Sequence, residues 1–514
     1  MARTGNIEQG AVPPPEAHGR HVLRGTVVSW AQYVVALAVT LAVTPFVLGR
    51  LGPAAYGVWL LFTQALGYSG LLDLGVTPAL VRYVSEARAR EDREALRQTL
   101  GTALRFHAAA ATACLLLGLL FAAGIERWFD LGEMPVDVAR QTAVVAALAT
   151  AVGFPATALT GALRGFQRFD LAAGLGVASH LVRAAAIFVA LELGMGLPGL
   201  AGAALLGSLV ALVGGGILLK RVSGLGLGFV SAGSHAALKK LLSLGAFSMV
   251  GTAGWQLAYG SDTILIAAML TAVDAAHFGL AVNVLVMVSA FVGAFTGNLM
   301  PLASIHEARG QTERLRRTYL LGTRIAATLA LPQLIVLFVE GQSLLGLWVG
   351  PKVGTPAGEI LQLLVLAYLP SFLNAAGVPL AFGVGLERVS AAMMTSEGVT
   401  KLGLSLLLIG PIGMKGVALA TLASGVVHQG LLWPWAICRQ LGLPLRSFWW
   451  QALGPLILPA VGLALGLLAW RHITPGVPVL LRFFVAATSV LLYWLYALKS
   501  IRHGGGRAAE AEGP

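Results

Sequence analysis

The chain consists of long apolar runs separated by short polar segments, and the runs recur from about residue 25 almost to residue 500. A hydrocarbon core of about 30 Å needs roughly 20 apolar residues for one helical crossing. The pattern therefore predicts an all-α, polytopic membrane protein with about 14 transmembrane helices. We expect the spans at residues 25–48, 56–83, 102–124, 138–162, 170–192, 197–219, 241–270, 275–303, 319–340, 359–384, 389–410, 415–437, 450–470 and 478–498.

Composition supports a bilayer rather than water as the solvent. Hydrophobic residues make up 57% of the 514 positions and charged residues only 11%, against roughly a quarter charged in soluble domains. The two cysteines, Cys114 and Cys438, lie in or beside apolar runs, so neither a disulfide framework nor a cysteine metal site is expected. The chain has no Gly-rich phosphate loop followed by Lys-Ser/Thr and no His-Glu-x-x-His motif. We therefore expect no enzyme activity and no cofactor.

The distribution of basic residues predicts the orientation in the membrane, because cytoplasmic loops collect Lys and Arg. With the N-terminus inside, 26 of the 35 basic residues fall on the cytoplasmic side and seven on the other. Short loops of this kind do not form a nucleic-acid-binding surface, despite the net charge of +12. We expect a protein of the cytoplasmic (inner) membrane with both termini in the cytoplasm. Residues 1–24 and 499–514 are predicted to be disordered cytoplasmic tails, and no signal peptide precedes the first span.

The two halves of the chain match as an internal repeat at a nearly constant offset of 217 to 223 residues. Because each unit has six spans, the repeat is parallel, about an axis along the membrane normal. We predict two six-helix lobes, residues 25–220 and 241–437, joined by a cytoplasmic linker at 221–240 and followed by two extra helices within 450–498. Two facing lobes favour a transporter with a cavity between them. The matching pairs are Tyr56-Gly57 with Phe278-Gly279, Pro78 with Pro301, Gly101-Thr102 with Gly322-Thr323, Gly165 to Arg168 with Gly385 to Arg388, and Gly196 to Gly199 with Gly413 to Gly416.

Cations within the spans are the first candidate functional residues. A buried charge in a membrane costs free energy, so it is expected to have a partner or a function. Arg183 lies near the middle of the fifth span with His180 one turn away, and Lys401 lies near the middle of the eleventh. One reading is a cationic cavity with one positive group from each lobe, suited to phosphate or carboxylate. The other is structural: Glu397, four residues before Lys401, neutralises it, and backbone carbonyls satisfy Arg183. Arg24, where the first span begins, joins the candidate substrate-binding cations.

Two acidic residues within spans are candidates for ion coupling. Asp73 and Asp262 could each accept a proton or Na⁺, or could hold a neighbouring helix through hydrogen bonds. For Asp73, the Gly75 and Pro78 that follow favour a helix break capped by the carboxylate. Glu397 is grouped with these acids, as a coupling or structural group.

Several motifs resemble one known family. The first quarter contains Arg50-Leu-Gly52-Pro-Ala-Ala-Tyr56-Gly57-Val-Trp59 and Leu72-Asp73-Leu-Gly75-Val-Thr-Pro78-Ala-Leu-Val-Arg82-Tyr83, and later parts contain Gly161-Ala-Leu-Arg164-Gly165-Phe-Gln167-Arg168 and Tyr259-Gly-Ser-Asp262. These segments resemble the O-antigen and exopolysaccharide repeat-unit flippases of the multidrug/oligosaccharidyl-lipid/polysaccharide exporter superfamily.

The resemblance implies a V-shaped, two-lobe fold. It also implies export of an undecaprenyl-diphosphate-linked oligosaccharide from the cytoplasmic to the outer leaflet for surface polysaccharide biosynthesis, driven by an H⁺ or Na⁺ gradient. The expected partners are the lipid-linked substrate, membrane lipid and other polysaccharide assembly proteins. In the related peptidoglycan lipid flippases the last two spans form a groove for the lipid tail.

Two other functions remain open from the sequence. A multidrug or cation antiporter of the same superfamily would have twelve spans and an acid-lined cavity, whereas this chain has mid-span bases and two added helices. A membrane glycan polymerase or ligase would need a long periplasmic loop, and the longest such loop is under about 20 residues.

Overall fold

The computed structural model describes the backbone of residues 15–129, 131, 134–225, 232–474 and 476–510, and the side chains of these residues outside 15–31, 244–248 and 498–510. All regular structure in these ranges is helical. The first lobe consists of α1 (Pro15–Gly67), the 3₁₀ helix η1 (Tyr68–Asp73), α2 (Val76–Ala89), α3 (Arg93–Trp128), α4 (Val136–Gly165), α5 (Phe169–Glu192) and α6 (Gly196–Ser223).

The second lobe contains shorter helices and two π-helical segments. Its elements are α7 (His235–Trp255), η3 (Gln256–Gly260), α8 (Ser261–Met269), α9 (Ala272–Thr296), α10 (Leu299–Ala308), α11 (Thr312–Val349), α12 (Pro351–Leu373), α13 (Gly377–Gly383), α14 (Glu387–Ile412), α15 (Met414–Gly425), η4 (Val426–Leu432) and α16 (Trp433–Leu441). The chain ends in α17 (Leu445–Ala452), α18 (Gly454–Ile473) and α19 (Val479–Glu510).

The helices agree with the predicted polytopic membrane fold. Within the described residues, twelve helices are long and apolar enough to cross a membrane. The first of these contains a reversal at Gly52, whose φ of 79° is readily adopted only by glycine, and Pro53 follows it. The reversal separates α1 into two arms, and the continuous run of α7, η3 and α8 provides one more crossing. Counted this way, the crossings number fourteen and occur in the predicted order.

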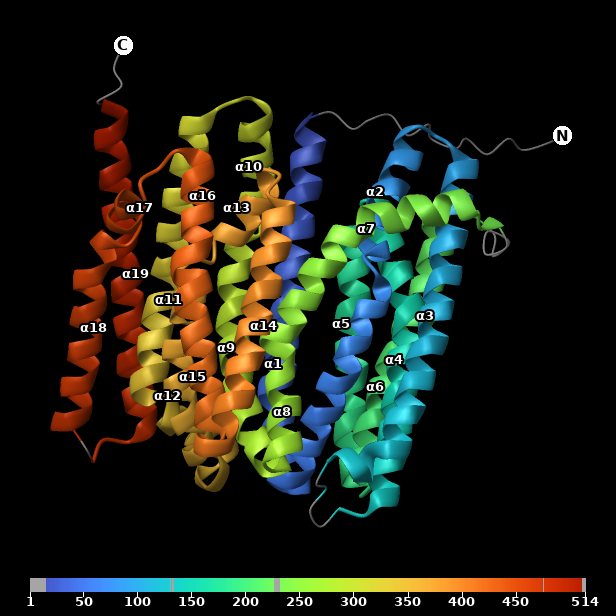
Figure 1. Ribbon diagram of the computed structural model, residues 1–514, viewed down its shortest axis with the longest axis horizontal. Helices are drawn as coiled ribbons and strands as arrows, with labels where there is room; N and C mark the ends of the chain where they lie inside the picture. The colour runs from blue at the N-terminus through green and yellow to red at the C-terminus, as the bar shows by residue number, and fades with distance from the viewer. Residues whose placement is uncertain (1–14, 130, 132–133, 226–231, 475, 511–514) are drawn as a thin grey trace.

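Figure 1 shows the two lobes side by side, with α18 and α19 at the outer edge of the second lobe. Here the upper face is the one at which α1 begins and α19 ends, and the lower face is opposite to it. The Trp494 indole donates a hydrogen bond to the Thr328 carbonyl of α11 (3.1 Å). Large apolar side chains such as Leu458 and Leu480 are 80% and 71% exposed on these outer helices. Such exposure fits a surface that contacts lipid.

The internal repeat is visible in the backbone. Residues with positive φ end or begin helices at equivalent places in the two lobes, where a left-handed residue lets the chain turn. The pairs are Glu91 and Gly310, Gln167 and Gly385, Gly196 and Gly413, and Gly224 and Gly442. Their separations of 217 to 219 residues match the offset of the sequence repeat, so the two six-helix lobes are structural as well as sequence duplicates.

The two arms of α1 join the lobes by packing against α9. The Tyr33 hydroxyl donates to the Met287 carbonyl at 2.7 Å. In the second arm, a Cβ atom at Gly57 would lie 1.7 Å from the Ala272 carbonyl oxygen, which shows how closely the backbones approach. One hydrophobic cluster continues across this contact, from Phe62 of the first lobe to Phe278 of the second.

Two tail predictions are wrong in part. Helix α1 begins at Pro15, so residues 15–24 are helical rather than disordered, and proline is well suited to a first helical position. Helix α19 continues to Glu510 through residues 499–510, where Arg507 to Glu510 are good helix formers. Residues 1–14 and 511–514 lie outside the described part of the chain. The same holds for residues 226–231 of the predicted linker.

Candidate functional site

A cavity of about 610 Å³ opens within the first lobe, at mid-height of its helices. It is bounded by the second arm of α1, η1, α2, α4, α5 and α6. The lining residues are Trp59, Thr63, Leu66, Gly67, Ser69, Gly70, Asp73, Thr77, Ala146, Ala149, Thr150, Gly153, Phe154, Thr157, Arg183, Ala204 and Ser208. The lining combines hydroxyl groups, small residues and two opposite charges. Cavities of this size hold drug-sized ligands.

Arg183 supplies the positive charge of this cavity. Gly207 of α6 lies directly opposite, and a Cβ atom there would be 3.2 Å from the Arg183 Cβ atom. The glycine therefore lets α5 and α6 approach closely at this level. Among the described residues, the Arg183 guanidinium makes no hydrogen bond and no ion pair, so its donors remain available to a ligand in the cavity.

Asp73 supplies the negative charge, and its position follows from a helix break. Leu74 and Gly75 are both left-handed, which ends η1 and lets α2 begin at Val76. The Asp73 carboxylate accepts hydrogen bonds from the Thr77 hydroxyl (2.6 Å) and the Thr77 backbone N–H (3.3 Å). The predicted break capped by the carboxylate is therefore present.

His107 of α3 is the partner of Asp73, and the sequence analysis missed it. Its ring is fully buried, and Nε2 lies 2.9 Å from Asp73 Oδ1. Its Nδ1 lies 2.8 Å from the Ala103 carbonyl oxygen, which can only accept, so Nδ1 carries a hydrogen. A histidine in the third apolar span was the available signal in the sequence.

The hydrogen bonds of His107 require a shared proton. With a hydrogen on Nδ1, a neutral imidazole presents a lone pair at Nε2, and an ionised carboxylate presents another at 2.9 Å. The contact is favourable only when a proton lies between them, on Nε2 or on the carboxyl group. In either case the Asp73–His107 pair is neutral as a whole, which leaves Arg183 as the net charge of the cavity wall.

Two other predicted cations lie outside this wall. His180 is half-buried on α5, one turn from Arg183, and is not a lining residue. Arg24 belongs to α1, and its side chain lies outside the described residues.

Lys401 does not face the cavity. Its side chain is 2% exposed, and its ammonium donates to Asp262 Oδ2 at 2.7 Å and to the Ala258 carbonyl of η3. The ion pair of Lys401 is formed with Asp262 on α8 and not with Glu397 on the same helix, which was the structural alternative. Lys401 therefore does not share the cavity of Arg183 in this structure.

Glu397 belongs to a hydrogen-bond network in the second lobe. Its carboxylate accepts from the Tyr259 hydroxyl at 3.2 Å and from the Gln429 amide at 2.8 Å. Gln429 in turn accepts from Asn374 at 3.1 Å. The network includes both π-helical segments, with Tyr259 in η3 and Gln429 in η4, and a π-bulge redirects backbone groups toward side chains. These contacts hold α12, α14 and the π-helical segments together.

Two solved structures share this two-lobe fold. The inward-facing conformation of a multidrug resistance MATE family transporter of the MOP superfamily aligns with a TM-score of 0.67 at 16% identity, covering 82% of this chain and 98% of that chain. The lipid II flippase MurJ in an inward closed conformation aligns with a TM-score of 0.66 at 12% identity, covering 91% and 97%. At these identities the likeness concerns the fold. The chain therefore has the two-lobe membrane fold of these structures.

The family follows from the sequence comparison. The model of the polysaccharide biosynthesis protein family matches residues 22–305, more than half of the chain, and the chain belongs to this family. The uncharacterized membrane protein EpsK of Bacillus subtilis (strain 168) is 22% identical over 440 residues, which cover 82% of this chain and 84% of that protein. The resemblance to the polysaccharide flippases is thereby confirmed. The matched region includes every residue that lines the cavity.

Proposed function

We propose that the protein is a flippase that moves an undecaprenyl-diphosphate-linked oligosaccharide from the cytoplasmic to the outer leaflet of the cytoplasmic membrane, for surface polysaccharide assembly. The observation that carries this proposal is Arg183, a guanidinium without a protein partner among the described residues, on the wall of the cavity in the first lobe. Its planar fork suits a phosphate group through two parallel hydrogen bonds.

Charge and shape both support an anionic headgroup. Because the Asp73–His107 pair is neutral, Arg183 leaves the wall with a net positive charge. Ser208 adds a hydroxyl group that can donate to a phosphate oxygen, and the Thr63 and Thr77 oxygens can accept from sugar hydroxyl groups. The volume of about 610 Å³ accommodates a diphosphate with the first sugars of an oligosaccharide, while the lipid tail stays in the bilayer.

We propose the proton of the Asp73–His107 pair as the coupling ion in an alternating-access cycle. When this proton leaves, the pair carries a negative charge that repels the diphosphate, so proton and anion reinforce each other's binding. An inside-negative membrane potential favours outward movement of the diphosphate by roughly 2.3 kcal/mol per charge at 100 mV. Because a proton that leaves with the headgroup moves against an inward proton gradient, the membrane potential acting on the diphosphate charge supplies the driving force, and the proton serves to permit binding.

Reconstitution tests the proposal. The purified chain in liposomes with a fluorescent polyprenyl-diphosphate oligosaccharide should move the lipid between leaflets, and Arg183→Gln should reduce the rate by about a hundredfold through loss of a charge-assisted, bidentate contact. Arg183→Lys should recover part of the rate. Arg221→Gln, an exposed residue at the end of α6, is the matched control. Wild-type movement in the Arg183→Gln chain would contradict the proposed role of the cavity.

The same liposomes separate this function from multidrug or cation antiport. Cationic substrates need an unpaired carboxylate, whereas the cavity carboxylate of Asp73 is paired with His107. We expect no uptake of cationic dyes under conditions that move the lipid-linked oligosaccharide. Dye uptake without lipid movement would contradict the flippase function and support cation antiport.

A further inference from the structure

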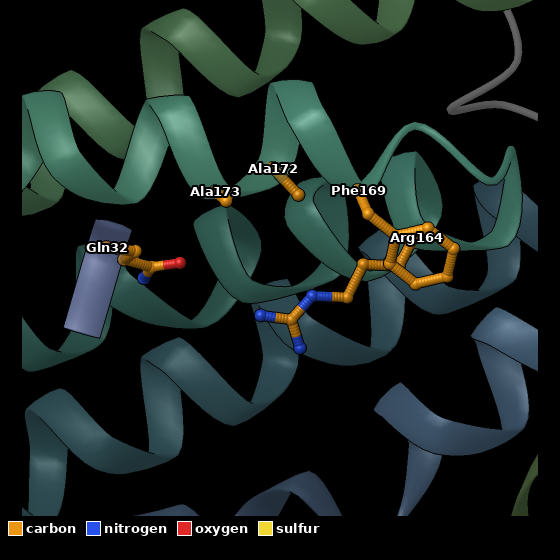
Figure 2. A pocket seen from close by; sticks show the side chains of 5 residues that line it. All are labelled: Gln32, Arg164, Phe169, Ala172 and Ala173. Atoms are coloured by element: carbon orange, nitrogen blue, oxygen red, sulfur yellow. The ribbon is translucent and has the colours of Figure 1, made fainter. Parts of the chain in front are cut away.

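A second pocket opens beside the upper face of the first lobe, between α1, α4 and α5. It has a volume of about 270 Å³ and is lined by Gln32, Arg164, Phe169, Ala172 and Ala173. Figure 2 shows the Arg164 guanidinium extended into the space between the Gln32 amide and the first turns of α5. Three helices thus surround one cation and one amide, with two alanines leaving room for a ligand.

The charge of Arg164 is not neutralised by the protein. Among the described residues this exposed guanidinium makes no hydrogen bond or ion pair. The carboxylate nearby in the sequence, Asp170, is held by both Nε and Nη2 of Arg168 at 3.0 Å. That pairing raises the pKa of Arg168, with the hydrogen bond that Arg168 donates to Asp170 as the largest cause. Arg164 therefore offers a full positive charge and free donors to the pocket.

One face of α5 contains residues of both the pocket and the cavity. Ala173, Gly176, His180 and Arg183 follow at intervals of three or four residues, which places them on one stripe of the helix. A Cβ atom at Gly176 would lie 2.5 Å from the Gln32 amide nitrogen, so the Gln32 side chain packs against this stripe between the two spaces. At 1.5 Å per residue, Arg183 lies about 15 Å below Ala173.

One face of α4 likewise contains residues of both the pocket and the cavity. Thr150, Gly153 and Thr157 line the cavity, and Arg164 continues their spacing by a further seven residues. Both helices therefore present one continuous side to the two spaces, with cations at the pocket end and at the cavity end. His180 lies between them on α5.

We propose that this pocket is a phosphate-binding site that holds the diphosphate of the substrate before it reaches Arg183. This inference rests on the proposed function and adds a separate loading site to it. Arg164 binds the phosphate oxygens through its fork, and the Gln32 amide donates a further hydrogen bond. The site takes phosphates and diphosphates, whether of a lipid headgroup or of a soluble compound.

Equilibrium binding to the full-length chain in phosphatidylcholine nanodiscs tests the inference. The probes are inorganic diphosphate and farnesyl diphosphate, and the variants are Arg183→Gln, Arg164→Gln, and both together, with Arg221→Gln as control. We expect the wild type to bind farnesyl diphosphate at two sites. Arg183→Gln should retain one site, and adding Arg164→Gln should weaken that remaining site by at least about tenfold.

The outcomes distinguish the pocket from the cavity. If Arg183→Gln alone removes all diphosphate binding, the pocket binds nothing and the inference is overturned, while the proposed function stands. If the double variant binds as well as Arg183→Gln, Arg164 is not a ligand and the inference also fails. Tighter binding of farnesyl diphosphate than of inorganic diphosphate assigns the pocket to lipid headgroups, and equal binding assigns it to soluble phosphates. Arg164→Lys, which keeps the charge, should recover part of the affinity and shows that the loss is not misfolding.

Discussion

His107 is expected to keep the Asp73 side of the cavity neutral. His107→Gln removes the group that shares a proton with the carboxylate, so Asp73 adds a negative charge to the cavity that also contains Arg183. At an effective dielectric constant of 20, a charge about 10 Å from a bound phosphate is worth roughly 1.7 kcal/mol, more than a tenfold change in affinity. The affinity of His107→Gln for farnesyl diphosphate should therefore be at least about tenfold below that of the wild type.

Asp73→Asn is the matched variant, because asparagine carries no charge and its amide can donate to His107 Nε2. Its affinity for farnesyl diphosphate should stay close to that of the wild type, and adding Asp73→Asn to His107→Gln should restore most of the lost affinity. Equal affinity of the wild type and His107→Gln would show that the charge of Asp73 does not act on the substrate.

Lys401 is expected to act as a structural ion-pair partner. Lys401→Met leaves the buried Asp262 carboxylate uncompensated, and breaking such a pair costs about 3–5 kcal/mol. In the double variant Lys401→Met/Asp262→Asn both charges are gone, and most of the stability should return. Thermal unfolding of the purified chains measures both values.

Substrate affinity provides an independent reading of the same variants. Since Lys401 is buried away from the cavity, the double variant should bind farnesyl diphosphate like the wild type. A double variant as unstable as the single one, or one that folds without binding the probe, would contradict the structural role.

The role of a site residue could be predicted from the sequence only where its environment depends on a single helix. Depth within an apolar run identified Arg183, and the Asp73-Leu-Gly75 sequence identified the helix break. Partners on other helices were not accessible in this way. Spacing along one helix suggested Glu397 for Lys401, whereas packing brought in Asp262 from α8 and a carbonyl of η3.

At the level of elements, the sequence predicted where spans lie but not how they are divided. Apolar length is sufficient to place a helix in a membrane, because every backbone group must be satisfied internally. Interruptions depend on local backbone and polar groups, as at Asp73 and the left-handed Leu74 and Gly75 before α2. The π-helical segments η3 and η4 have no distinct periodicity, so the hydrophobic pattern could not reveal them.

Close packing between the lobes depends on Gly57 more than on its repeat partner Gly279. A Cβ atom at Gly57 would meet the Ala272 carbonyl oxygen at 1.7 Å, which is backbone and cannot rotate away. At Gly279 it would meet the end of the Leu60 side chain at 2.5 Å, which can change rotamer. Gly57→Ala should therefore separate α1 from α9, whereas Gly279→Ala should be tolerated.

Distances between spin labels measure this separation. Met195 and Leu347 are each 55% exposed near the lower ends of α6 and α11, in different lobes. Labels at these positions should give longer or broader distances in Gly57→Ala than in the wild type, and unchanged distances in Gly279→Ala. Equal effects of the two alanines would show that backbone contact at Gly57 does not hold the lobes together.

For the molecule as a whole, duplication explains both what the sequence predicted and where the prediction failed. The nearly constant offset of the sequence repeat predicted two equivalent lobes. The left-handed turns at Gly224 and Gly442 show the same equivalence in the backbone. Equivalent folds nevertheless hold different chemistry. In this conformation the first lobe has a cavity with a cation on its wall, while the buried Lys401 of the second lobe is paired with Asp262. Symmetry in sequence therefore suggested that Lys401 and Arg183 share a cavity, whereas packing buries Lys401 away from it.

Orientation in the membrane is the remaining whole-molecule prediction, and it rests on the excess of Lys and Arg on the upper face. A green fluorescent protein joined after Pro514 should fluoresce, because that face should lie in the cytoplasm. Alkaline phosphatase inserted at Gly194, the exposed turn between α5 and α6 at the lower face, should be active. The same insertion at Gly224, the turn after α6 at the upper face, should be inactive and is the matched control. Activity at Gly224 with none at Gly194 would show that the protein has the opposite orientation in the membrane. The pocket at Arg164 would then face the outer leaflet, where it could not bind a substrate made in the cytoplasm before transport.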